Sequence, residues 1–600
     1  MVTTPLRWDL SNVYPGLDSP DLEKDIEWVK DTAEALRKLY EDELVRVDET
    51  SSPEEINGAM STMVDKLNAL MVKMYTIHAY LHSFISTDSF DKQAARMGSQ
   101  FDQVMVGTQK VNILLRAWVG KFKDMLPEVL ALGNSAGEHA FPIMEIAEQS
   151  KYMMSEKEEV LSSELSLAGS RAWTKLQGIV TSQKAVDFEL NGETQTLPMP
   201  ALINLHAHPD ESVRKGAYEA EMAAWESVKE PLAACMNGVK GWVNTLNDHR
   251  GRKDALHGPI DQGRIDRETL DAMIGAMEES FPTFRRYFKA KAARFGQEAL
   301  PWWNVFAPTG KLEKGFTFTE AANFILKNFG KFSPELKDFA KTAFDNRWID
   351  AEQRSGKRGG AFCMSIPGVK ESRIMCNFDG SLDQVMTIAH ELGHGYHNFN
   401  MFQAGKTPLQ RQTPMTMAET ASIMCETIVF NAVMETITDP QAELALLEAA
   451  LIGDSQVIVD IFSRFIFEKE VFERRAKAEL SADELCEIMG DAQAATYGDG
   501  LDADFRHKFM WTWKPHYYSA GLSFYNFPYA FGMLFGVGLY AIYQQRGEAF
   551  IPDYKKLLSS TGEAPAAELA ARFDIDIRSK KFWEDSLAVI GKRIDRYCEL

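Results

Sequence analysis

Apolar residues recur every three or four positions along most of the chain, which is the pattern of amphipathic helices. From residue 1 to about 180 one such segment follows another. In "SPDLEKDIEWVKDTAEALRKLYEDELV" Ser19 is placed to cap a helix and Pro20 fits its first turn. Helical periodicity resumes at Pro200 and continues to about residue 350. We therefore expect a mainly α-helical protein.

The period changes from helical to alternating at three places. "AVDFELNGETQTLP", residues 185–198, alternates around Asn191-Gly192, a dipeptide that suits a two-residue hairpin turn. Two short β-like runs follow at 361–366 and 373–378, where glycines interrupt the helical pattern. These patterns predict one hairpin and a small sheet that lies just before a cluster of histidines.

The hairpin also marks a division of the chain. Six hundred residues exceed what one hydrophobic core usually supports, and 45% hydrophobic residues are enough to fill two cores. We expect an N-terminal helical lobe over residues 1–198 and a second domain, which carries the histidine cluster, over residues 199–600.

Charge and cysteine content narrow the class of protein. A formal charge of −21 argues against nonspecific nucleic-acid binding, because phosphate contacts need a basic face. The six cysteines are scattered without a CxxC pair, as in proteins of a reducing compartment. The start of the chain has no basic segment followed by an apolar core. We expect a cytoplasmic protein with no nucleic-acid partner.

One stretch, residues 517–545, runs without a charge and is long enough to span a bilayer. Asn526, Pro528 and several tyrosines interrupt its first half, whereas a membrane-spanning helix tends to keep its aromatic residues at the two ends. We expect a loop that leads into a buried helix, and no membrane partner.

The histidine cluster is "TIAHELGHGYHNF". Ser381 and Gln384 form a capping-box pattern ahead of it, and apolar residues at helical spacing follow. His390 and His394 therefore share one helix face and can bind one Zn²⁺, with Glu391 beside the open coordination position as a base. The alternative is a pair of solvated histidines on a helix surface.

A catalytic zinc usually takes three protein ligands, so a third must be found. His397 lies about 4.5 Å further along the helix axis than His394, too far from the point that the first pair shares. The metzincin pattern also fails, because Asn400 stands where that pattern needs a histidine. We expect His397 to be a bystander or a residue on the substrate side.

The next helical segment, "MTMAETASIMCETIVF", offers Glu419 as the third ligand. A simple capping box between Thr416 and Glu419 is the alternative, and spacing alone leaves both open. Glu426, two turns further on, could then hold a ligand histidine by its second nitrogen.

Four ordered motifs resemble oligoendopeptidase F, of the M3 zinc metallopeptidases related to thimet oligopeptidase. They are "WDLSNVYPGL", "HELGH", "MAETAS" and "PHYY…FYNFPYAFG", and the resemblance runs nearly end to end. It implies a mostly α-helical, two-lobed, clam-like zincin with a deep substrate channel, one zinc ion per chain and cleavage of short unstructured peptides. It also implies that residues 199–600 form the M3 catalytic domain.

Carried over position by position, the resemblance assigns three zinc ligands, one base and three residues that stabilise the oxyanion: His390, His394 and Glu419; Glu391; His516, Tyr525 and Tyr529. The run "RIMCNFDG" resembles the family's strand that pairs with extended substrate backbone. The chain departs from the thimet branch at Ala421, where that branch has proline, and at Gly532, where it has a further tyrosine.

As a mechanism we expect that zinc acidifies a water, that Glu391 accepts its proton, and that the late tyrosines or His516 donate to the developing oxyanion. Two alternatives stay open. One is a zinc exopeptidase that releases single C-terminal residues or dipeptides, because no obvious carboxylate-binding arginine decides the matter. The other is a non-catalytic peptide-binding helical protein, which the complete set of ligands disfavours.

Overall fold

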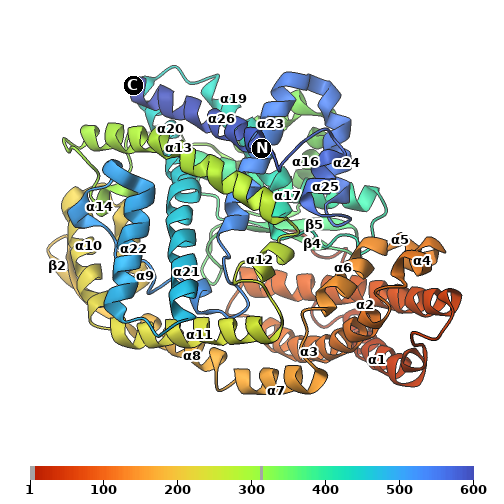
Figure 1. Ribbon diagram of the computed structural model, residues 1–600. Coiled ribbons are helices and arrows are strands. Elements are labelled where there is room, and N and C mark those ends of the chain that lie inside the picture. Colours follow the sequence, from red (N-terminus) through yellow and green to blue (C-terminus); the bar gives the residue numbers. More distant parts are fainter. Residues whose placement is uncertain (1–6, 311–314) are drawn as a thin grey trace. The chain divides into compact units, whose positions relative to one another are not determined.

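The structure is a computed structural model that describes residues 7–310 and 315–600 (Figure 1). The described chain is mainly α-helical, with one hairpin and one three-stranded sheet, which confirms the expected class. It forms two compact units, each assembled from three stretches of sequence. Unit 1 comprises Met1–Met153, Lys314–Glu435 and Ile542–Asp574, and unit 2 comprises Met154–Glu313, Thr436–Ala541 and Ile575–Leu600. The division of the sequence into segments 1–198 and 199–600 stays a prediction.

Unit 1 begins with helices that pack around a core containing Leu22, Trp118 and Phe122. Helix α1 starts at Pro20 as predicted, but the Ser19 hydroxyl makes no capping bond and is buried without a hydrogen-bond partner among the described residues. The helices of this unit are α1 (Pro20–Asp42), α2 (Pro53–Thr87), α3 (Lys92–Lys121), α4 (Leu126–Ala131), α5 (Asn134–Glu138), α6 (Ala140–Ser150), α15 (Phe318–Phe332), α16 (Pro334–Asp345), α17 (Leu382–Gln403), α18 (Met415–Ala418), α19 (Thr420–Met434), α24 (Ile551–Ser560) and α25 (Ala566–Ala571).

Unit 1 also holds the three-stranded sheet, in the order β3 (Ile349–Asp350), β5 (Glu371–Met375), β4 (Phe362–Ile366). Strand β5 is parallel to β3 and antiparallel to β4. The predicted run at 361–366 matches β4, whereas β5 begins and ends earlier than the predicted run at 373–378.

The assignment of "RIMCNFDG" as the strand that pairs with substrate is wrong. Ile374 of β5 pairs with Ile349 on one side and with Cys363 on the other, so both of its edges are taken there. The edge strands are the two-residue β3 and the longer β4. An alternating pattern shows which residues share a face, but it does not show which strand lies in the centre, and the two-residue β3 has no pattern of its own.

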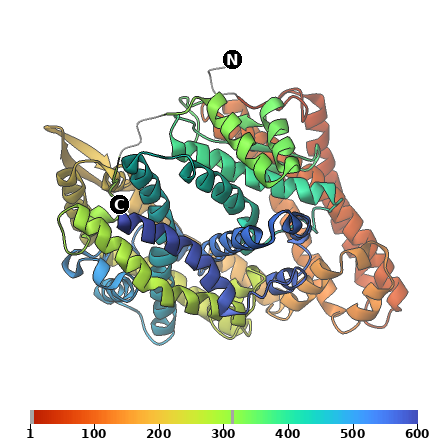
Figure 2. The same ribbon diagram turned by 90° about the horizontal axis from the view of Figure 1, so that it is seen from above.

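Unit 2 contains the predicted hairpin, formed by β1 (Ala185–Leu190) and β2 (Glu193–Pro198). Asn191 and Gly192 both have positive φ, 55° and 81°, as a two-residue turn of this kind requires. The helices of this unit are α7 (Glu156–Ser166), α8 (Ser170–Gln183), α9 (Met199–Asn204), α10 (Glu211–Glu226), α11 (Lys229–His249), α12 (His257–Gln262), α13 (Arg267–Arg294), α14 (Trp302–Val305), α20 (Pro440–Ser455), α21 (Ile461–Arg475), α22 (Ala482–Tyr497) and α26 (Lys580–Glu599). Helices α13 and α26 lie side by side although they are far apart in the sequence (Figures 1 and 2).

The uncharged stretch at 517–545 follows the expected course. A short 3₁₀ turn, η6 (Pro515–Tyr518), and a loop lead into α23 (Phe527–Arg546), whose first part is largely buried. Among the described residues, no helix combines the length and the apolar character that crossing a membrane requires.

Candidate metal centre

Helix α17 carries both histidines of the predicted pair. The Ser381 hydroxyl accepts a hydrogen bond from the Gln384 backbone N–H at 3.2 Å, so half of the expected capping box is formed. The Gln384 side-chain oxygen has no partner among the described residues, so the other half is missing. His390 and His394 are four positions apart and therefore share one face of the helix. Leu392, between them in the sequence, is buried on the core side.

The backbones of α17 and α19 approach each other closely at Gly393. A Cβ atom at this position would lie 2.5 Å from the Ala421 carbonyl oxygen and 2.5 Å from the Ser422 Cα. Only glycine fits without moving one of the helices. The close approach places Glu419, which directly precedes α19, beside the two histidines of α17.

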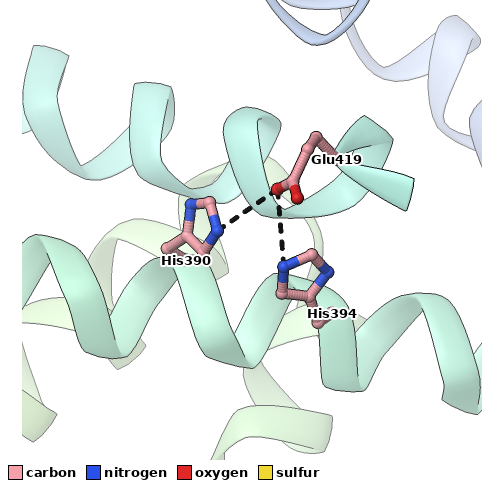
Figure 3. Close-up of side chains that lie close together, drawn as sticks. All are labelled: His390, His394 and Glu419. Atoms are coloured by element: carbon pink, nitrogen blue, oxygen red, sulfur yellow. Dashed lines mark ion pairs between the residues drawn. The ribbon is translucent and has the colours of Figure 1, made fainter. Parts of the chain in front are cut away.

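Figure 3 shows the two imidazoles on one helix and the Glu419 carboxylate directed at both of them. Glu419 Oε2 lies 3.2 Å from His390 Nε2 and 3.4 Å from His394 Nε2. One potential ligand atom from each of the three residues lies within 4.8 Å of the others. Each side chain is about a quarter exposed, at 25%, 24% and 23% for His390, His394 and Glu419. The group therefore opens to solvent on one side.

Two further residues hold this group in place. Glu426 Oε2 accepts a hydrogen bond from His390 Nδ1 at 3.0 Å, as the sequence predicted for a ligand histidine. The Ser422 hydroxyl donates to Glu419 Oε2 at 2.6 Å. Sequence reasoning missed Ser422, because a serine one turn after a glutamate is ordinary in a helix.

The alternative role of Glu419 in a capping box is not formed. Helix α18 begins at Met415, and Pro414 occupies its N-cap position. The Glu419 carboxylate is instead shared among His390, His394 and Ser422. Between α18 and α19, the Glu419 carboxylate contacts the two histidines and does not cap a helix.

Glu391 lies on α17 next to His390 and is only 6% exposed. Its Oε2 atom is buried without a hydrogen-bond partner in the described part of the chain. Burial raises the pKa of Glu391 to about 7, the Glu419 charge acts in the same direction, and His390 opposes both. A carboxyl group with such a pKa can take up and release a proton near neutral pH.

The carboxylates around the grouped side chains attract positive charge. Burial would raise the pKa of Glu419, but the hydrogen bond from His390 first, and then the neighbouring imidazoles and the Ser422 hydroxyl, lower it to about 2. Burial lowers the pKa of His394 to about 4, so this imidazole is neutral. Burial also opposes charge on His390, but Glu419 and Glu426 together raise its pKa to about 10. Two imidazole nitrogens and one carboxylate oxygen form the donor set of a catalytic zinc site, so the residues fit that metal.

His397 stands apart from this group. Its Nε2 atom lies 2.9 Å from the Thr561 hydroxyl, and the ring is almost fully buried. Burial lowers the pKa of His397 to about 4. It is not among the residues that come together as potential ligands, in agreement with the sequence analysis.

A cleft of about 1100 Å³ lies over the grouped residues within unit 1. Its walls come from α2, the edge strand β4, α17 and the loop between α17 and α18. His390, His394, Glu391 and Glu419 all line it. The cleft is large enough for a short stretch of peptide.

The three predicted oxyanion residues come together in unit 2. Tyr529 donates a hydrogen bond to the Tyr525 hydroxyl at 2.9 Å. The His516 ring lies 5.9 Å from the Tyr525 ring between centroids, and His516 Nε2 lies 3.2 Å from Asn526 Nδ2. Burial lowers the pKa of His516 to about 3, and nearby cations, Arg464 first among them, act in the same direction. The imidazole is therefore neutral.

A buried ion pair holds the loop that carries Tyr525, between η6 with His516 and α23 with Tyr529. Lys240 Nζ on α11 and Glu468 Oε1 on α21 lie 2.5 Å apart, and both side chains are 0% exposed. Glu468 Oε2 accepts a hydrogen bond from the Phe524 backbone N–H at 3.1 Å. Phe524 has φ of 52°, a strained value for a bulky residue. Sequence reasoning missed this pair, because its members belong to helices that are far apart in the chain.

Comparison with known proteins gives a family match and similar folds. The model of peptidase family M3 matches residues 204–589. Oligopeptidase PepF of Bacillus subtilis is 21% identical over 601 aligned positions, covering 99% of this chain and 87% of that protein. A crystal structure from Chlamydophila abortus superposes with a TM-score of 0.83 at 17% identity, over 99% of this chain and 98% of the other. The structure of oligoendopeptidase F from Enterococcus faecium superposes with a TM-score of 0.70 at 17% identity, over 96% and 98%.

Proposed function

Because the chain belongs to peptidase family M3, we propose that it is a zinc-dependent endopeptidase that cleaves short, unstructured oligopeptides at internal bonds. Membership in the family makes it an oligopeptide-cleaving metallopeptidase, as its relatives are named. The identity of the metal as zinc and the roles of individual residues are the proposal. One zinc ion per chain is proposed, because one group of three potential ligands comes together in the described residues.

The convergence of His390, His394 and Glu419 carries this proposal. The three side chains offer the donor set of a catalytic zinc, and Glu391 adds a buried carboxyl oxygen without a protein partner beside them. A non-catalytic peptide-binding protein would have no use for such a base. Zinc supplies the Lewis acidity that polarises a carbonyl and acidifies water.

The chain's own residues then have distinct tasks. Glu391 accepts the proton of the attacking water at its free carboxyl oxygen and passes it to the leaving amine. Glu426 fixes the orientation of the His390 ring through Nδ1, and Ser422 fixes the Glu419 carboxylate. These contacts orient two of the three potential ligands, His390 and Glu419.

We also propose His516, Tyr525 and Tyr529 as donors to the developing oxyanion. The neutral state of His516 and the contact between the two tyrosine hydroxyls support this role, since all three groups can donate a proton in a hydrogen bond. The alternative role of the two tyrosines is that of core aromatics with satisfied hydroxyls, but Tyr529 is 36% exposed, which argues against it for that residue.

The edge strand β4 is proposed to bind the peptide backbone. Residues Phe362–Ser365 line the cleft, and β5 occupies only one side of this strand. An extended peptide can therefore add to the sheet through main-chain hydrogen bonds. Recognition of this kind tolerates many sequences and excludes folded proteins, whose backbones are already paired.

Mass spectrometry of cleavage products tests the proposal. Purified protein is incubated with a set of unstructured peptides and one folded protein, with and without a chelator, and in parallel as the Glu391→Gln variant. Internal cuts confined to the peptides, and lost with both controls, are the expected result. Release of only C-terminal residues or dipeptides would show an exopeptidase, and intact peptides with metal bound would show a binding protein.

A cytoplasmic location is also proposed. All six cysteines are free thiols in the structure, which suits a reducing compartment. The strongly acidic composition suits a protein without a nucleic-acid partner.

A further inference from the structure

Arg411 lies in the loop between α17 and α18 and lines the same cleft as the metal centre. Its guanidinium carbon lies 4.4 Å from the centre of the Phe402 ring. Nη1 approaches the Ser365 hydroxyl of strand β4 at 3.4 Å, a long hydrogen bond. Nε is buried without a hydrogen-bond partner among the described residues. Burial lowers the pKa of Arg411 to about 10, so the side chain stays charged at neutral pH.

No carboxylate neutralises Arg411 within the described part of the chain. The acidic residues that line the cleft are Glu391 and Glu419, and both belong to the metal centre. The remaining ionisable lining includes Arg358, His78 and His82. Although the chain has a net charge of −21, no other carboxylate of the described residues lines this cleft. Such a wall attracts negative groups of a ligand.

Several buried cations of the described chain have acidic partners, whereas the buried Arg214 donates to Asn304 and to backbone carbonyl oxygens. Lys240 pairs with Glu468, Lys291 lies 2.7 Å from Glu448, and Arg373 lies 2.9 Å from Glu371. A charge taken out of water is costly unless it is paired and hydrogen-bonded. Arg411 is partly buried, has no carboxylate partner among the described residues and lines a cleft, so a ligand is well placed to supply that partner.

We propose that Arg411 binds a carboxylate of the bound peptide, either its C-terminal carboxylate or an aspartate or glutamate side chain. This inference rests on the proposed function and adds a determinant of substrate choice to it. A guanidinium offers two parallel N–H donors that match the two oxygens of a carboxylate. Its contact with Ser365 places it beside the edge strand along which an extended peptide would lie.

Peptide pairs that differ only in one carboxylate test the proposal and separate its two sources. One pair has a free or an amidated C-terminus. A second, amidated series replaces glutamate by glutamine at one position after another. For each pair the measured quantity is the ratio of kcat/KM for the charged peptide to kcat/KM for the neutral peptide.

Wild-type protein is expected to prefer the charged member of at least one pair. Because a hydrogen bond to a charged group is worth about 1.5–3 kcal/mol, Arg411→Met should lower that ratio about 10- to 100-fold. Arg411→Lys keeps the charge without the planar fork and should restore part of the preference. Arg358→Met is the matched control, since Arg358 lines the same cleft but is exposed.

Three results would overturn the inference. Ratios equal in wild type and Arg411→Met would show that Arg411 does not sense the ligand's charge. An equal fall in kcat/KM for both members of each pair would show a structural role for the contact with Phe402. A loss of preference in Arg358→Met but not in Arg411→Met would assign the carboxylate to the other arginine.

A binding measurement keeps this inference separate from the proposed activity. Fluorescence anisotropy with labelled free-acid and amidated peptides is carried out on the Glu391→Gln protein and on Glu391→Gln/Arg411→Met. Preferential binding of the charged peptide to the first but not to the second would support Arg411 even if no peptide were cleaved. Equal binding of the charged and neutral peptides by the Glu391→Gln protein would overturn the inference whatever the catalytic result.

Discussion

The metal-centre side chains of unit 1 lie on α17 and directly before α19, two helices that are near neighbours in the sequence. In unit 2, the loop that carries Tyr525 joins η6, with His516, to α23, with Tyr529. This loop depends instead on α11 and α21, since the buried Lys240–Glu468 pair holds Phe524. One region is preorganised by helical spacing and one close backbone approach at Gly393. The other is preorganised by charges brought from distant parts of the chain.

The difference shows two ways in which a fold positions functional side chains. A helix fixes residues four positions apart on the same face, so His390 and His394 need little help to converge. A loop has no such repeat, and its backbone keeps a strained conformation only where surrounding contacts determine it. The two regions should therefore respond to different substitutions.

The largest expected effect comes from Glu391→Gln in the first region. The amide cannot accept the proton of the attacking water, so kcat should fall about 10²- to 10⁴-fold. Bound metal, measured by elemental analysis, should remain, because Glu391 is not part of the ligand group. Asp383→Asn, in the first turn of the same helix, is the control and should keep a normal kcat. Near-normal turnover in Glu391→Gln would remove its role as the base.

Lys240→Met addresses the second region. It leaves Glu468 as a fully buried charge without its partner, which typically costs about 3–5 kcal/mol of stability. The unfolding transition should shift to lower temperature, while metal affinity, measured by titration, should stay at the wild-type value. The double variant Lys240→Met/Glu468→Leu removes both charges and should recover part of the loss. A parallel fall in metal affinity would break the distinction between the two regions.

Tyr529→Phe tests the oxyanion chemistry proposed for the second region. The ring keeps its edge contact with Tyr525, whose centroid lies 5.4 Å away, but the donor hydroxyl is lost. Removal of one oxyanion donor typically lowers kcat by about 10²- to 10³-fold. Tyr543→Phe, further along α23, is the matched control, because its ring packs against Phe332. An unchanged kcat in Tyr529→Phe would leave this tyrosine a packing role only.

The smallest effect is expected from Glu426→Gln. The amide oxygen can still face His390 Nδ1, but it carries no charge, and loss of such a partner typically weakens metal binding about 10- to 100-fold. Competition with a chromophoric chelator measures this affinity. Glu435→Gln, at the exposed end of α19, is the control for charge alone. Equal affinities in the two variants would show that the His390–Glu426 contact does not tune the site.

Several features were predictable from the sequence because each depends on residues a few positions apart. Helical periodicity located α17, and the four-residue spacing placed His390 and His394 on one face. Asn191-Gly192 gave the hairpin, since both residues tolerate positive φ. Glu426 followed from its two-turn distance to Glu419, although the capping-box alternative for Glu419 could be excluded only in three dimensions.

Tertiary structure decided what depends on partners from elsewhere in the chain. The central position of β5 requires the short strand β3, which has no pattern of its own. The Ser19 position alone suggested a cap, but its hydroxyl makes no capping bond. The Lys240–Glu468 pair and the lack of a carboxylate partner for Arg411 could not be predicted from the sequence. A charged residue in a sequence does not show which charges will lie next to it in the fold. Short-range geometry therefore determined the helices and half of the metal centre, while long-range packing and charge pairing decided the rest.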